Sequence, residues 1–199
     1  MKWDKTRKVG EEVSRWYIEA IENGFMNKYL SGDKLLDIGS VGYLSGTTTY
    51  HENAINIDSN TPNYDMIHIP FDDESIDAIL ASHILEHVPT QNVKKVIQEW
   101  LRVLKIGKYA VITVPHQFLY ERKINLPSKH NGDHKRFYTP AKLLTEIETA
   151  LEPNTYRVEL CKDNSKGFDY SIPLSQHPNG AYEVMLILKK IKKPEWSLE

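Results

Sequence analysis

Apolar side chains follow a helical spacing in the first part of the chain and again in its middle. The first stripe indicates a helix over residues 8–30, in which Gly24 is the expected weak point. The second stripe indicates a helix over residues 91–104, where Thr90 can cap the start and Gly107 stands just past the end. The apolar positions are Val9, Val13, Trp16, Tyr17, Ala20 and Ile21, then Val93, Val96, Ile97, Trp100, Leu101 and Leu104.

A third helix is indicated by Thr139 and Pro140, which form a cap and first turn for a helix that ends at about Leu151. Short apolar runs alternate with the helices and predict buried strands. This alternation is typical of an α/β fold with right-handed crossovers and a parallel sheet covered on both faces. The predicted strands lie at residues 34–39, 54–58, 64–69, 76–82, 109–114, 156–161 and 182–188.

The last two predicted strands have no helical pattern between them, and we expect them to pair antiparallel at the edge of the sheet. Their connection, residues 162–181, is about 20 residues long. A loop of this length in a compact domain is usually functional or disordered. Its unusually apolar stretch is expected to cover the site or a subunit interface, as in a homodimer. The residues concerned are Phe168, Asp169, Tyr170 and Ile172.

The composition fits one domain over residues 1–199, with an N-terminal helical cover (1–31) and a core (33–190). Forty per cent of the residues are apolar, which is enough to close a core without disulfides. The 25 basic and 27 acidic residues leave a net charge of −2, which argues against a nucleic-acid partner. The single cysteine, Cys161, indicates a reducing compartment. No apolar run suits a signal peptide or a membrane span, so we expect a cytoplasmic protein.

The stretch LLDIGSVG (35–42), followed by NID (56–58), is typical of a nucleotide site. A strand ends, a glycine turn brings backbone N–H groups near a ligand, and Asp58 follows Asp37 by 21 positions. Such an acid can accept hydrogen bonds from a ribose diol. On these residues alone, an ordinary strand and turn with a surface aspartate is the alternative.

Three further segments favour the nucleotide site over an ordinary strand and turn. They are IPFDDESIDAILASHILEHV (69–88), EWLRVLKIGKYAVITVPH (99–116) and HKRFYTPAKLLTEIE (134–148). Together they resemble the class I S-adenosylmethionine-dependent methyltransferases, in the subgroup with a type 11-like domain. The resemblance implies a Rossmann-like three-layer sandwich with a seven-stranded, mostly parallel sheet. Its strand order would be 3-2-1-4-5-7-6, with strand 7 antiparallel and the cofactor at the carboxyl ends of the first strands.

The resemblance also assigns roles to residues of this chain. Asp58 matches the acid that holds the ribose hydroxyls, and either Asp65 or the nearby Ile67–His68 stretch would lie near the adenine. Ser82 and His83 end the fourth strand, where the family lines the methionine end of the cofactor. The Glu86–His87 pair that follows is interpreted as mainly structural. The implied S-adenosylmethionine-binding set is Asp37, Gly39, Ser40, Gly42, Asp58, Asp65, Ser82 and His83.

The sequence departs from the family pattern around the glycine turn. Val41 stands where the second glycine is expected, and a Cβ there restricts backbone conformation and approach to a ligand. Only six residues separate Asp58 from Asp65, so the usual helix between strands two and three is missing. The cofactor pocket is then built differently or is lost, and a non-catalytic binding or assembly module is the alternative function. A Rossmann dehydrogenase is disfavoured because no full G-x-G-x-x-G is present.

Five of the eight histidines fall between positions 83 and 134, mostly at predicted strand ends. A hydroxyl or amine acceptor of a methyl group must lose a proton, and histidine suits that task near neutral pH. His116 and His134 are the predicted catalytic bases, and the sequence does not decide between them. For His83 the alternative role is contact with the cofactor instead of proton transfer.

Two histidine pairs have the spacing of metal ligands on a helix: His83 with His87, and His130 with His134. No cysteine accompanies either pair, and Asn131–Gly132 is a turn signal that breaks a helix inside the second pair. We therefore expect no metal, and we interpret His87 as a packed, hydrogen-bonded side chain.

The stretch GDHKRFYTP (132–140) combines basic and aromatic residues near the predicted site. Arginine can bind a phosphate or carboxylate while an aromatic ring stacks on a sugar or base. A solvated basic turn is the alternative reading. The preceding segment, 115–132, is long enough for a lid or an acceptor-binding wall. We predict a small polar acceptor, such as a sugar or nucleotide-sugar, and a substrate-binding set of His130, Arg136 and Tyr138.

Overall fold

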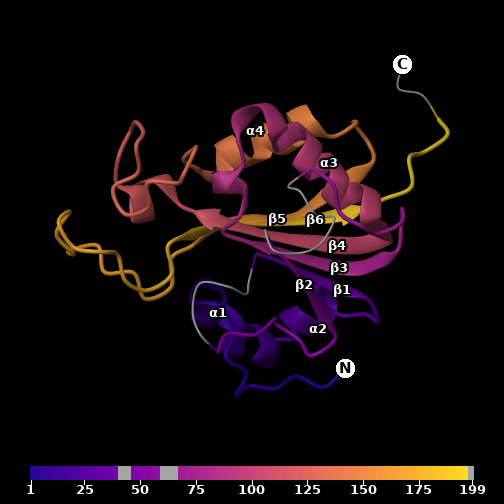
Figure 1. Cartoon of the computed structure of the whole chain (residues 1–199), viewed down its shortest axis with the longest axis horizontal. Coiled ribbons are helices and arrows are strands. Elements are labelled where there is room, and N and C mark those ends of the chain that lie inside the picture. The colour runs from indigo at the N-terminus through magenta and orange to yellow at the C-terminus, as the bar shows by residue number, and fades with distance from the viewer. Residues whose placement is uncertain (40–45, 59–66, 197–199) are drawn as a thin grey trace.

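The computed structural model of the chain describes residues 1–39, 46–58 and 67–196. These residues form three layers, with one sheet between two pairs of helices (Figure 1). The pair α1 and α2 covers one face, and the pair α3 and α4 covers the other (Figure 1). The helices are α1 (Glu11–Glu22), α2 (Phe25–Tyr29), α3 (Val93–Val103) and α4 (Pro140–Ala150), with short turns at Leu85–His87, Thr90–Asn92 and Gln117–Glu121.

The sheet confirms the predicted fold class and strand order, but not the number of strands. The described residues form a six-stranded sheet in the order β2-β1-β3-β4-β6-β5. The first four are parallel, and β6 runs antiparallel to both β4 and β5. The expected edge strand at 64–69 falls largely outside the described residues, and 67–69 belong to no strand. The strands are β1 (Leu35–Ile38), β2 (Ala54–Ile57), β3 (Ile76–Ser82), β4 (Leu104–Pro115), β5 (Tyr156–Asn164) and β6 (Glu183–Lys190).

Two of three predicted helix signals agree with the structure, those at Gly24 and Thr139, and the one at Thr90 does not. Gly24 adopts φ +80° and separates α1 from α2, which confirms it as the break. Thr139 caps α4 by accepting a hydrogen bond from the backbone N–H of Lys142, as predicted. Thr90 does not cap α3; its hydroxyl oxygen instead accepts a bond from Arg136. The cap prediction was wrong because a tertiary partner competes for the same hydroxyl.

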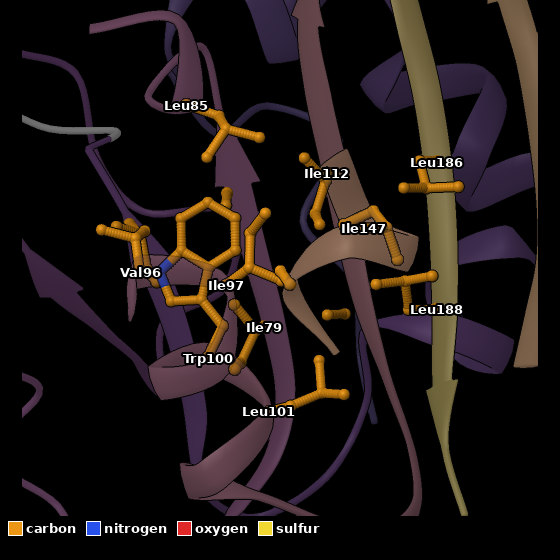
Figure 2. Packing of buried hydrophobic residues seen from close by; sticks show 14 of the residues in the cluster. Ile79, Leu85, Val96, Ile97, Trp100, Leu101, Ile112, Ile147, Leu186 and Leu188 are labelled. Carbon is orange, nitrogen blue, oxygen red and sulfur yellow. The ribbon is translucent and has the colours of Figure 1, made fainter. Parts of the chain in front are cut away.

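The α3 side of the sheet holds the larger of two main apolar clusters (Figure 2). Trp100 lies on the sheet-facing side of α3, near Leu85, Val96 and Ile97 (Figure 2). The smaller cluster packs α1 and α2 against the opposite face. The predicted apolar stripe of α3 is therefore the face that it buries, as its spacing requires.

The four parallel strands end at the same edge of the sheet, which is where such folds place their chemistry. The connections after β4 and β5, residues 116–139 and 165–182, extend beyond this edge (Figure 1). Arg122 joins them by donating to the carbonyl oxygens of Ile172, Pro173 and Gln176. The two long loops are therefore joined to each other beyond the carboxyl edge.

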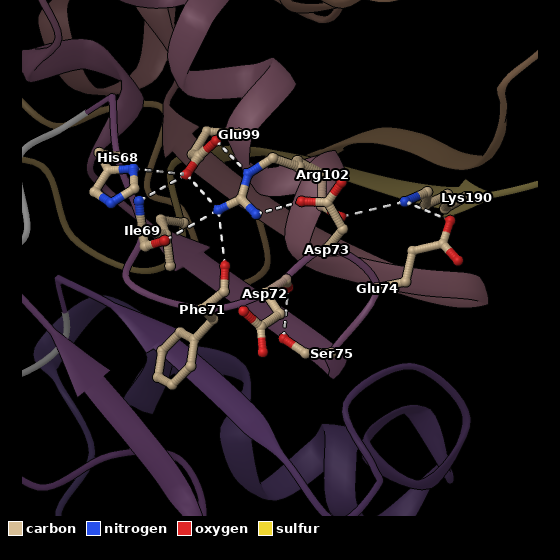
Figure 3. Close-up of polar contacts among 10 residues, drawn as sticks. All are labelled: His68, Ile69, Phe71, Asp72, Asp73, Glu74, Ser75, Glu99, Arg102 and Lys190. Carbon is tan, nitrogen blue, oxygen red and sulfur yellow. Dashed lines mark hydrogen bonds and ion pairs between the residues drawn. The ribbon is translucent and has the colours of Figure 1, made fainter.

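A guanidinium holds the chain where it enters β3 (Figure 3). Arg102 of α3 donates to the Glu99 carboxylate at 2.7 and 2.8 Å and to Asp73 Oδ1 at 2.6 Å. It also donates to the carbonyl oxygens of Ile69 and Phe71, at 3.0 and 2.9 Å. Glu99 in turn accepts from the Ile69 N–H at 2.8 Å. Arg102 thus satisfies backbone groups of a segment that has no regular secondary structure.

Replacing Arg102 with methionine is expected to lower the free energy of unfolding by about 2–3 kcal/mol. The apolar side chain keeps the stem but leaves two carbonyl oxygens and the Glu99 carboxylate without their donor. Arg102→Lys should recover only part of the loss, because an ammonium lacks the forked geometry. Urea denaturation measures both, with the exposed Arg157→Met as control. Equal stability of Arg102→Met and the wild type would contradict this role.

The same variant should change the acid side of the stability profile. The hydrogen bond from Arg102 lowers the pKa of Glu99, against the opposing effect of burial. A lowered pKa in the folded state adds stability above the unfolded value of about 4.3, and that stability is lost as the pH falls through the folded value. Arg102→Met should therefore lose less stability than the wild type between about pH 5 and 3.

Candidate active site

The turn after β1 is built so that only glycine fits. Gly39 has φ +80°, and its N–H donates to the Ile57 carbonyl oxygen at 2.8 Å. A Cβ at this position would lie 1.9 Å from Cδ1 of Ile84. Asp37 is fully buried in β1, and its Oδ2 accepts from the Tyr50 N–H at 2.7 Å. Asp37 therefore supports the returning chain, and Gly39 sets the turn.

Asp58 directly follows β2, at the same edge of the sheet as Gly39. It is half-buried, and its Oδ2 accepts from the Asn56 side-chain amide at 2.8 Å. The remaining members of the predicted cofactor set, Ser40, Gly42 and Asp65, lie outside the described residues, as does Val41.

Ser82 and His83 stand where β3 ends, as predicted. Ser82 is buried and accepts a hydrogen bond from the Thr113 hydroxyl at 3.0 Å. His83 has φ +55°, a conformation that a non-glycine residue rarely adopts and that often marks a functional position. Its ring lies between two carboxylates, with Nδ1 3.6 Å from Glu86 Oε1 and Nε2 3.6 Å from Glu183 Oε1.

The two carboxylates change the protonation of this cluster. Burial by itself would lower the pKa of His83, but Glu183 and Glu86 outweigh it and raise the pKa. Glu86 is fully buried, and burial raises its pKa to about 7 despite the attraction of His83 and His134. An imidazole held between two acids favours its charged form, so His83 is poorly suited to accept a proton.

Glu183 begins β6 and links the sheet to α1. Asn164 donates to its Oε2 at 2.6 Å, and Nη1 of Arg15 lies 3.6 Å from its Oε1. Arg15 also donates to the Tyr182 hydroxyl at 2.5 Å, and its guanidinium lies over the Tyr182 ring. Arg15 of α1 thus places a mostly buried positive charge next to Glu183.

His116, one predicted base, has both ring nitrogens engaged. It is buried, and Nδ1 accepts from the Phe118 N–H at 3.0 Å. Nε2 therefore carries the proton, and it lies 3.2 Å from Oδ1 of Asp163. Burial lowers the pKa of His116, and Asp163 opposes this only in part. No ring nitrogen is left to receive a proton in this arrangement.

His134, the other predicted base, is held differently. It is buried, and its Nδ1 lies 2.5 Å from Oε1 of the buried Glu121. The hydroxyl of Ser128 donates to the second oxygen of Glu121, which keeps that carboxylate an acceptor. Glu121 therefore holds the proton on Nδ1 and leaves the lone pair on Nε2. This is the orientation that a carboxylate gives to a reactive histidine.

His87 lies beside His134, with ring centroids 4.8 Å apart. Burial and the nearby His134 lower the pKa of His87 to about 4. The backbone N–H of Lys135 donates to the Glu86 carbonyl oxygen at 2.7 Å, which fixes the long loop against the turn after β3. His87 of the first predicted pair therefore contacts His134 of the second pair.

Two of the three predicted substrate-binding residues, Arg136 and Tyr138, bond to other groups of the same chain. Arg136 donates to the Val88 carbonyl oxygen at 2.7 Å and pairs with Glu146 at 3.1 Å. Tyr138 is buried, and its hydroxyl donates to Glu146 at 2.6 Å. Their sequence pattern could not reveal these internal partners. His130 is half-buried in the long loop, and its role in substrate binding stays a prediction.

A family model described as "Methyltransferase domain" matches residues 45–112. The match covers β2, β3, α3 and most of β4, and with them the turn that carries Glu86 and His87. This part of the chain is therefore similar to a methyltransferase domain. His116 and His134 lie outside the matched range, so the match does not assign their roles.

Solved structures share the fold of this chain. A SAM-dependent methyltransferase of Archaeoglobus fulgidus is 15% identical, with a TM-score of 0.56 and coverage of 88% of this chain and 94% of that one. One from Aquifex aeolicus is 16% identical, with a TM-score of 0.52 and coverage of 89% and 93%. The [4+2]-cyclase SpnF is 14% identical, with a TM-score of 0.54 and coverage of 87% and 81%.

The fold alone does not define the reaction, because one of these relatives is named as a cyclase. A search of curated protein sequences found no match. Among the described residues, no helix is long and apolar enough to cross a membrane.

Sequence reasoning missed the acids that organise the histidines. Glu121 orients His134, and Glu183 faces His83, yet each stands far from its partner in the chain. Glu86 is adjacent to His87, and the sequence pattern favours a structural role for it. Its burial beside two imidazoles could not be read from the sequence, because it depends on the long loop folding back.

Proposed function

We propose that this chain binds S-adenosylmethionine at the carboxyl edge of the sheet and transfers its methyl group to a small polar acceptor. The observation that carries the proposal is the position of Asp58. This acid directly follows the second strand of a methyltransferase-family fold, next to the glycine turn after the first strand.

The residues present fit the cofactor in two respects. The Asp58 carboxylate offers oxygens that can accept hydrogen bonds from vicinal ribose hydroxyls. The half-buried backbone of Gly39 lies at the same edge of the sheet, where a ligand can approach it on the side that Ile84 does not fill. Ser82 and His83 would border the methionine portion, since they end the next strand of the sheet.

The cofactor supplies a methyl group that is already activated, so the protein mainly has to align the reactants and exclude water. The joined loops, residues 116–139 and 165–182, extend beyond the edge where these reactants would lie (Figure 1). Between these loops, Tyr120 packs against His130 and His177, with ring centroids 5.5 Å from each. Such rings suit the face of a sugar or a base, in keeping with a sugar or nucleotide-sugar acceptor.

His134, rather than His116, activates the acceptor in this proposal. Its Nε2 keeps a lone pair because Glu121 holds the proton on Nδ1. His116 would first have to break its contact with Phe118 or Asp163. The geometry therefore favours one of two histidines between which the sequence does not decide.

The proposal is tested by following transfer of labelled methyl from S-adenosylmethionine to a panel of sugars, nucleotide-sugars and other small polar acceptors. We expect acceptor-dependent release of S-adenosylhomocysteine, lowered at least about hundredfold by His134→Gln. Arg157→Gln, at an exposed position near the start of β5, is the control and should keep full activity. Binding of the cofactor without transfer to any acceptor would favour the alternative, a non-catalytic binding module.

A further inference from the structure

Three potential ligand atoms from separate parts of the chain converge beside the carboxyl edge. Glu86 and His87 come from the turn after β3, and His134 comes from the loop before α4. One ligand atom of each lies within 4.8 Å of the other two. The bond from the Lys135 N–H to the Glu86 carbonyl oxygen ties the two segments together.

Glu86 is the second observation that points to a ligand. Its side chain is about 1% exposed, and neither carboxylate oxygen has a hydrogen-bond partner within the described part of the chain. His83 and His87 lie no closer than 3.6 and 3.9 Å. A buried carboxylate normally finds strong partners, because removing it from water is costly. A cation between Glu86 and the two imidazoles would supply them.

The orientation of His134 fits the same interpretation. A metal-binding histidine commonly donates its other ring N–H to a carboxylate, which fixes its tautomer and orientation. Glu121 makes this contact with Nδ1 of His134, and Ser128 in turn donates to Glu121. Nε2 of His134 is then the atom available to a metal.

We propose that Glu86, His87 and His134 bind a divalent transition-metal ion such as Zn²⁺. Two imidazoles and one carboxylate form a ligand set that suits zinc and leaves a coordination position open. At bond lengths of about 2.0–2.2 Å, the ligand atoms must lie closer together than they do here, so side chains draw in by about 1 Å. The proposal replaces the expectation of no metal, which rested on spacing within single segments.

The open coordination position of the ion can bind the hydroxyl of the methyl acceptor, a role that rests on the proposed function. A hydroxyl bound to the metal loses its proton more readily, as water does on zinc. His134 would then activate the acceptor as a ligand of the ion rather than by taking the proton itself. Binding of the metal needs neither cofactor nor acceptor, so the two proposals can fail separately.

Calorimetric titration of the metal-free full chain with Zn²⁺ tests the site, without cofactor or acceptor. We expect one ion per chain. His87→Gln, His134→Gln and Glu86→Gln should each weaken binding at least tenfold, and Glu121→Gln by about 10–100-fold. His68→Gln should bind as the wild type does, because this exposed histidine lies near a different acid, Glu99. Co²⁺ in place of Zn²⁺ should give visible absorption bands that disappear in His87→Gln.

Thermal unfolding and urea denaturation separate loss of metal binding from loss of folding. Zn²⁺ should raise the thermal midpoint of the wild type but not of His87→Gln, since a ligand stabilises only the state that binds it. Urea denaturation without metal should show that His87→Gln, at a half-buried position, folds normally. Absence of Zn²⁺ binding, or binding that survives both His87→Gln and His134→Gln, would overturn the proposal.

Discussion

Replacing Trp100 with alanine is expected to lower the free energy of unfolding by about 3–5 kcal/mol. The indole is 1% exposed and lies between α3 and the sheet, in the largest apolar cluster (Figure 2). Truncation removes its contacts and leaves a cavity that the neighbouring strands cannot fill. Urea denaturation measures the loss as a lower midpoint with an unchanged slope.

Trp196 provides the matched control, because it is 60% exposed. Trp196→Ala should change stability by less than about 0.5 kcal/mol. Trp100→Phe should lose much less than Trp100→Ala, since the indole N–H of Trp100 has no hydrogen-bond partner among the described residues. A loss below about 1 kcal/mol in Trp100→Ala would contradict the central packing role assigned to this side chain.

Asp58→Ala is expected to weaken S-adenosylhomocysteine binding at least about hundredfold, or about 2.7 kcal/mol. The variant removes a carboxylate that would accept two hydrogen bonds from the ribose, each worth about 1.5–3 kcal/mol when one partner is charged. Isothermal titration calorimetry measures the affinity directly, without any need to know the methyl acceptor.

Glu52→Ala is the control for this variant, because the exposed Glu52 precedes the same strand at its opposite end. It should bind S-adenosylhomocysteine as the wild type does. Asp58→Ala must also keep a normal urea midpoint, so that lost affinity is not lost folding. An affinity within threefold of the wild type in a folded Asp58→Ala would place the ribose elsewhere.

The elements along the chain could be predicted because each carries its own local signal, whereas the order of the strands in the sheet was implied by the resemblance to known methyltransferases. The apolar stripe of α3, the cap of α4 at Thr139 and the β-branched run of β4 all depend on neighbouring residues. The strand end at Ser82 and the acid after β2 followed from the same alternation. Local periodicity was therefore sufficient for the layers and for the edge where the candidate site lies.

The side-chain partners could not be predicted, because they come from contacts between distant segments. Arg136 looked like a substrate ligand in a basic turn, but Val88 and Glu146 occupy its guanidinium. His116 and His134 looked equivalent until Asp163 and Glu121 distinguished their ring nitrogens. These pairings depend on how the long loops fold back over the sheet, and no spacing within one segment reports that.

Binding of S-adenosylmethionine at the carboxyl edge of the sheet is tested most directly by titrating the wild-type chain with S-adenosylmethionine and, separately, with S-adenosylhomocysteine. We predict saturable binding of one molecule per chain, with a dissociation constant in the range of about 1 μM to 1 mM that is typical for enzyme substrates. No detectable binding of either compound at several millimolar would contradict the account.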